Sequence, residues 1–142
     1  MSRPASTPAL ILAVLIAGVA PAPAQANDTL TPGQVAAAQQ VFTGEADCEF
    51  KQKIGIHPVE GRPGYFKLAY KRAHYVLVVQ ETSTGAVRLE DPRSGIVWIQ
   101  IPAKSMLMNS HIAQRLVDSC QHPAQKSTGN QARGGEPQLL RP

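Results

Sequence analysis

The sequence has few aromatic residues, few charges and only two cysteines. Aromatic residues make up 5% of the 142 positions and charged residues 17%, and the cysteines are Cys48 and Cys120. The longest uncharged apolar stretch, residues 9–20, is shorter than the ~20 residues that a membrane-spanning helix needs. These absences argue against an integral membrane protein and against a scaffold held together by several disulfides.

Enzyme signatures are also missing. The chain contains neither a G-x-S-x-G nucleophile motif nor a glycine loop of the phosphate-binding type. The acidic pair Glu90-Asp91 borders a turn, where carboxylates are normally solvated. We therefore predict a binding protein that is not an enzyme and needs no cofactor; an enzyme would require titratable groups clustered in a pocket.

The N-terminal residues resemble an export signal. Arg3 is the only charge before Asp28, residues 9–20 are apolar, and Ala24-Gln25-Ala26 fits the A-x-A cleavage pattern. We predict a signal peptide at residues 1–26 and a periplasmic protein. No cysteine follows the cleavage site to carry a lipid, so no membrane anchor is expected in the mature chain.

Two cysteines in an exported domain most simply form one disulfide, which predicts a Cys48–Cys120 bond. The alternative is a metal site formed by these cysteines and His122. Such a site is not predicted, because the histidines lack the spacing typical of zinc ligands.

The mature chain is mildly basic. Removing residues 1–26 removes one basic residue and no acid, which leaves 13 basic and 10 acidic residues and a net charge of +3. The cations are scattered, and only Lys71 and Arg72 are adjacent. Nucleic-acid binding normally needs a clustered basic face, so no nucleic-acid partner is predicted.

Turn residues divide the chain into short segments. Thr31 and Pro32 predict a helix start, with the helix over residues 34–42 inside an N-terminal lead at 27–47. From Cys48 onward, Phe50, Ile54 and Ile56 alternate with polar residues as in a strand. Further strands are predicted at residues 65–70, 74–80, 86–90 and 96–101.

Six or seven short strands with tight turns predict an all-β fold, a small antiparallel β-barrel or sandwich with a short N-terminal helix. The predicted β-barrel domain covers residues 48–121. Residues 109–120 fit either a helix or a turn followed by a strand. Residues 122–142 are rich in Gly, Pro, Gln and Ser and are predicted to be a disordered tail.

Four segments resemble a known family. They are STGAVRL at 83–89, GIVWI at 95–99, AKSMLM at 103–108 and LVDSCQ at 116–121. Together they are similar to the MliC/PliC family of periplasmic and membrane-bound inhibitors of c-type lysozyme, which are small exported β-barrels. The sequence departs from the family pattern where Thr84 replaces a serine and Arg88 a tyrosine, and where Lys104 stands further beyond Trp98.

The resemblance implies a c-type lysozyme as partner, with a target-binding site formed by Thr84, Lys104, Ser83 and Arg88. In that reading a hydroxyl and an ammonium group contact the two carboxylates of the lysozyme cleft. The alternative is a non-inhibitory envelope protein of the same fold that binds a small ligand or an envelope component. Trp98 is expected to fill the core.

Overall fold

Eight antiparallel strands follow one another around a single sheet in the order of the sequence. The structure is a computed structural model that describes residues 29–127. The strands are β1 (Gly44–Asp47), β2 (Lys53–Pro58), β3 (Tyr65–Tyr70), β4 (Ala73–Gln80), β5 (Val87–Asp91), β6 (Ile96–Gln100), β7 (Ser105–Asn109) and β8 (Gln114–Cys120). The predicted all-β fold is confirmed, whereas the predicted signal peptide, residues 1–26, lies outside the described residues.

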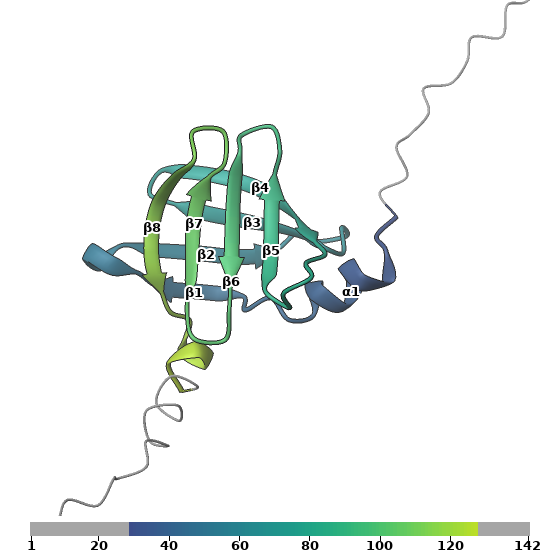
Figure 1. The fold of residues 1–142 in the computed structure, drawn as a ribbon, viewed down its shortest axis with the longest axis horizontal. Helices are drawn as coiled ribbons and strands as arrows, with labels where there is room; N and C mark the ends of the chain where they lie inside the picture. Colours follow the sequence, from purple (N-terminus) through teal and green to yellow (C-terminus); the bar gives the residue numbers. More distant parts are fainter. Residues whose placement is uncertain (1–28, 128–142) are drawn as a thin grey trace, which may run out of the picture.

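The sheet curls until its first and last strands meet, which makes a nearly closed barrel. Strands β5–β8 run across β1–β3 as two layers (Figure 1). At the seam, Asp47 and Gln121 exchange two backbone hydrogen bonds of 2.8 and 3.1 Å. The predicted Cys48–Cys120 disulfide is present and ties the end of β1 to the end of β8. Hydrogen bonds and a covalent bond therefore close the barrel at the same place.

The barrel interior is filled by side chains that alternate with outward-facing ones along most of the strands. Ile54, Leu68, Leu77, Leu89 and Leu107 are fully buried. Trp98 is 2% exposed among them, which confirms its expected place in the core. Period-two alternation of this kind places one face of every strand inside. An eight-stranded barrel has an interior just wide enough for such side chains.

Helix α1 (Pro32–Ala38) begins where the sequence predicts and ends earlier than the predicted residue 42. Thr31 and Gln34 form a reciprocal capping box at its start. Beyond the helix, the Gln100 side chain accepts a hydrogen bond from the Phe42 N–H at 2.9 Å and donates one to the Gln40 carbonyl at 2.7 Å. These two bonds hold the chain extended toward β1, so the helix cannot continue.

The barrel starts before the predicted limit of residue 48, whereas its last strand ends at Cys120, next to the predicted limit of 121. Strand β1, Gly44–Asp47, lies within the segment assigned to the lead and pairs with β2. Only Ala46 of its four residues, GEAD, is buried, so the sequence lacks the alternation of apolar and polar residues that predicts a strand. Residues 114–120 form strand β8, which settles the choice between helix and strand left open by the sequence.

The described part of the expected tail is ordered. Residues 123–127 form a helical turn against the barrel, and Gln125 is fully buried. The Gln125 amide donates to the Ile101 carbonyl and to Ser105 Oγ, both at 2.8 Å. The predicted disorder from residue 122 is therefore wrong for residues 122–127. The composition of residues 122–142, rich in Gly, Pro, Gln and Ser, suggested disorder. Residues 122–127 are ordered because they bind the barrel through polar contacts rather than apolar ones. Residues 128–142 lie outside the described residues.

Candidate target-binding site

Two loops that carry segments resembling the lysozyme inhibitors, 81–86 and 101–104, lie at the same end of the sheet. Gln80 pairs with Arg88, and Gln100 pairs with both Val87 and Ser105. The β4–β5 loop (81–86) and the β6–β7 loop (101–104) must therefore leave the sheet on one side. Gly85 and Pro102 line one shallow depression of about 270 Å³ between them. A single partner can contact both loops.

The β4–β5 loop presents hydroxyl groups on a tight turn. Thr82 Oγ1 donates to the Ala86 carbonyl at 2.6 Å, and Thr84 Oγ1 accepts from the Ala86 N–H at 3.4 Å. Gly85 has φ +77°, a value that side-chain-bearing residues rarely adopt. Ser83 and Thr84 are both exposed. Their hydroxyls are therefore accessible, with Thr84 partly engaged by its own loop.

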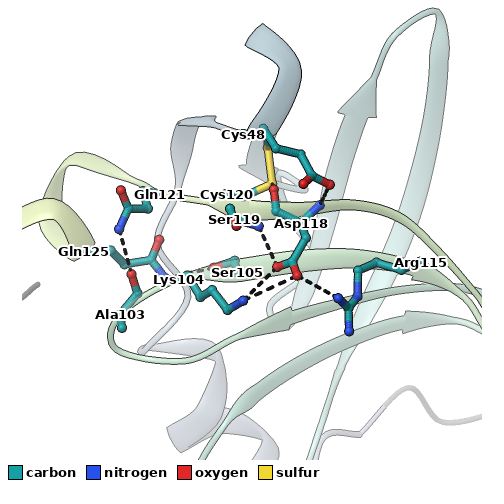
Figure 2. A network of polar contacts seen from close by, with 11 residues as sticks. Cys48, Ala103, Lys104, Ser105, Arg115, Asp118, Ser119, Cys120, Gln121 and Gln125 are labelled. Atoms are coloured by element: carbon teal, nitrogen blue, oxygen red, sulfur yellow. Dashed lines mark hydrogen bonds and ion pairs between the residues drawn. A yellow bond between two sulfur atoms is a disulfide. The ribbon is translucent and has the colours of Figure 1, made fainter.

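Lys104 does not point toward this loop. Its Nζ lies 3.1 and 3.4 Å from the two carboxylate oxygens of Asp118 on β8 (Figure 2). Arg115 Nη1 contacts the same carboxylate at 2.8 Å. The Lys104 side chain thus reaches from the start of β7 to β8, on the side away from β5. The loops of Thr84 and Lys104 come together, whereas the two side chains diverge.

Asp118 is the centre of this polar cluster. Its side chain is 12% exposed, compared with 39% for Lys104 and 55% for Arg115. The hydrogen bond from the Ser119 N–H, together with Lys104 and Arg115, holds the pKa of Asp118 below its ordinary value of 3.8, although burial opposes this shift. Two cations share the Asp118 carboxylate, and the Glu49 carboxylate lies against the backbone of the same residue, since it accepts a hydrogen bond from the Asp118 N–H at 2.8 Å.

The lowered pKa of Asp118 predicts acid sensitivity. A carboxylate whose pKa is lower in the folded protein stabilises it above the unfolded pKa near 3.8, and this contribution disappears as the pH falls through the folded pKa. Asp118→Asn should lower the free energy of unfolding by about 2 kcal/mol at pH 7, because Lys104 and Arg115 lose a charged acceptor.

The measurement is urea unfolding of wild type and Asp118→Asn at pH 7 and at pH 3. The difference between the two proteins should shrink at pH 3. Glu60→Gln is the matched control, since Glu60 is an exposed carboxylate in the β2–β3 loop. Equal stability at pH 7 would contradict the assigned role of Asp118.

Arg88, the fourth predicted residue, lies on the outer face of β5 rather than on a loop. Its Nε donates to Glu90 on the same strand at 2.9 Å. The side chain is 37% exposed and is already paired. Of the predicted set, Ser83 and Thr84 share one loop, and Lys104 and Arg88 both form ion pairs elsewhere.

Comparisons with known proteins add no relative. Protein-family models, curated proteins and solved structures were all searched, and none matches this chain. Residues 29–127 contain no group of three His, Cys, Asp or Glu that could hold a metal ion. In the same range, no helix has the length and apolar character to cross a bilayer.

Sequence reasoning missed three contributors to this region. Asp118 and Arg115 stood in a segment of undecided structure, so their approach to Lys104 could not be foreseen. Phe50 was expected on the buried face of a strand with Ile54 but is 85% exposed on the β1–β2 turn. The nearby Cys48 was the one available signal, because its predicted bond to Cys120 places this turn beside the end of β8.

Proposed function

We propose that the protein is an exported inhibitor that binds the active-site cleft of a c-type lysozyme through one end of its barrel. The observation that carries this proposal is the common position of loops 81–86 and 101–104, which hold the residues of the family-like motifs. The disulfide is compatible with export. Periplasmic location and the lysozyme partner are part of the proposal.

The filled interior favours recognition at the barrel surface. Small eight-stranded barrels either fill their interior with side chains or hold one ligand inside. Here Leu77, Val79, Leu89 and Leu107 are completely buried within the barrel, with Trp98 beside them. A partner must therefore be recognised by the loops and the outer face. This supports a protein-binding function over ligand storage inside the barrel.

The cation cluster supplies the chemistry for an acidic cleft. Lysozyme-type clefts carry two carboxyl groups with separate roles. Lys104 can turn from Asp118 to a target carboxylate while Arg115, at 2.8 Å, still neutralises Asp118. The exposed hydroxyls of Ser83 and Thr84 can contact the rim of the same cleft. Binding thus leaves the Asp118 carboxylate paired with Arg115.

The proposal predicts a strong effect of Lys104 and a weaker effect of Thr84. In a lysis assay with a c-type lysozyme, Lys104→Ala should weaken inhibition by about 30-fold or more, because a charge-assisted contact in a desolvated cleft is a typical hot spot. Thr84→Ala should weaken it about fivefold, since a neutral hydroxyl contributes less. Lys67→Ala, an exposed lysine on the outer face of β3, is the matched control.

Each variant also requires a thermal unfolding curve, because Lys104 contacts Asp118 within the fold. Loss of inhibition with a normal melting temperature supports a direct contact. Absence of inhibition by the wild-type protein rejects the proposed function. Full inhibition by Lys104→Ala would show that this lysine does not reach the target.

One observation favours a second function, the binding of a small envelope component. A groove of about 670 Å³ lies on the outer face of β3–β5, with Tyr65, His74, Val76 and Glu90 in its lining. Aromatic and polar groups of this kind suit a sugar–peptide fragment. NMR titration with soluble muropeptides should then shift the signals of Val76 and Glu90, and unchanged spectra would reject this function.

A further inference from the structure

Phe50 is the most exposed large apolar residue of the described chain. Its side chain stands on the β1–β2 turn and is 85% exposed, compared with 62% for Ile112 and 46% for Val76. A single exposed apolar residue is common on protein surfaces. Phe50 differs from such residues in its backbone conformation.

Two consecutive residues of this turn adopt left-handed backbone conformations without glycine. Phe50 has φ 55° and ψ 34°, and Lys51 has φ 57°. This region disfavours side-chain-bearing residues, and strained residues of this kind gather at binding and active sites. A glycine or asparagine would relieve the strain, yet the chain places an aromatic and a cation here. The conformation therefore suggests that the two side chains are presented for a purpose.

The base of the turn is rigid. The Cys48 N–H donates to the Gln52 carbonyl at 2.8 Å, and Cys48 is bonded to Cys120 on β8. The Tyr70 hydroxyl donates to the Gln52 side chain at 2.6 Å. Glu49, the first residue of the turn, accepts a hydrogen bond from the Asp118 N–H at 2.8 Å. The tip is thus fixed on β8 before any partner arrives.

The same contacts connect this tip to the cation cluster of the candidate site. Asp118 binds Glu49 through its backbone and Lys104 through its side chain. Figure 2 shows Cys48 on one side of Asp118 and Lys104 on the other. Lys51 is exposed and forms no ion pair with any residue from 29 to 127. The Phe50–Lys51 tip and the Lys104–Arg115 cations therefore flank one segment of β8.

We propose that Phe50 and Lys51 form a second contact with the inhibited enzyme, Phe50 entering an apolar pocket and Lys51 pairing with a carboxylate at its edge. This proposal rests on the proposed function. It extends the interface of the proposed function along β8, from Lys104 to Phe50. Buried aromatic anchors and adjacent cations are characteristic of binding hot spots.

The rigidity of the tip favours a protein partner over a lipid surface. A fluid bilayer adapts to an inserted side chain and needs no fixed backbone geometry, whereas a protein pocket gains affinity from a preorganised ligand. Stable attachment to a bilayer also needs more apolar area than one phenyl ring provides. An enzyme with an acidic, partly apolar cleft fits the two side chains better.

The test compares inhibition of a c-type lysozyme by wild type, Phe50→Ala, Phe50→Asn and Lys51→Ala. Both Phe50 variants should weaken inhibition at least 30-fold, and Lys51→Ala should weaken it about fivefold. Phe50→Asn tolerates the left-handed backbone, so its melting temperature should equal or exceed that of wild type while inhibition is still lost. Val35→Ala, which changes a 45% exposed apolar residue on α1 far from the tip, should inhibit normally.

Three results would overturn the proposal. If wild type inhibits the lysozyme and both Phe50 variants inhibit it equally well, the second contact is rejected and the proposed function stands. No inhibition by wild type rejects the proposed function and this contact together. The third result combines two assays. If wild type sediments with anionic phosphatidylglycerol vesicles, and Phe50→Ala no longer sediments but still inhibits, the tip binds a membrane surface instead.

Discussion

Replacement of both Cys48 and Cys120 by alanine is expected to lower the free energy of unfolding by about 4 kcal/mol. The bond closes a loop with a sequence separation of 72, and the chain-entropy model gives roughly this value for a loop of that length. Without the bond, the unfolded chain gains conformational freedom that the folded barrel does not. Because a domain of this size is stable by only about 5–15 kcal/mol, the expected change is a large fraction of its stability.

The position of the disulfide adds to this expectation. It lies beside the Asp47–Gln121 bridge, where only two backbone hydrogen bonds join the first and last strands. Removing the bond leaves the seam to these two backbone bonds and to side-chain contacts such as that of Glu49 with the Asp118 N–H, so β1 should exchange amide protons faster than β3 or β4.

Urea unfolding of the oxidised wild type and the double variant measures the effect. Reductant should shift the unfolding midpoint of wild type toward that of the variant and leave the variant unchanged. A loss of less than about 1 kcal/mol would mean that the seam is stable without its covalent bond.

The central hairpins could be predicted because their local signals agree with the fold. Pro92 and Gly95 mark the β5–β6 turn, and β-branched residues fill β4 and β6, so both local propensity and alternation indicate strands. The common end of loops 81–86 and 101–104 then follows from antiparallel connectivity alone. This part of the candidate site required no knowledge of distant contacts.

The remaining features depend on contacts between residues far apart in sequence. Asp118 reaches Lys104 across a β7–β8 register shift, and no local pattern predicts where a bulge places a side chain. Gln125 is buried through hydrogen bonds that its polar neighbours do not suggest. Phe50 follows an alternating pattern, but Cys48 and Gln52 close a turn that removes it from the strand. In each case tertiary contacts override the local signal.

Trp98→Ala is expected to destabilise the protein by about 3–5 kcal/mol, because deletion of a buried indole leaves a cavity that the barrel can only partly close. Trp98 is 2% exposed and pairs across the sheet with Leu89 and Leu107, both fully buried. These strands are held on both sides, so they cannot move inward far enough to fill the space. The free energy of unfolding, measured in urea, gives the loss directly.

Comparison of Trp98→Phe with Trp98→Ala separates the effect of lost side-chain volume from the effect of the lost indole N–H. The indole Nε1 is buried and has no hydrogen-bond partner among residues 29–127, so Trp98→Phe removes a polar group that contributes no bond there. Trp98→Phe should therefore cost about 1 kcal/mol, well below Trp98→Ala. Residual inhibition should follow the folded fraction in both variants, because the side chain lies inside the barrel. A folded Trp98→Phe protein with selectively lost inhibition would instead show that the indole shapes the β6–β7 loop used for binding.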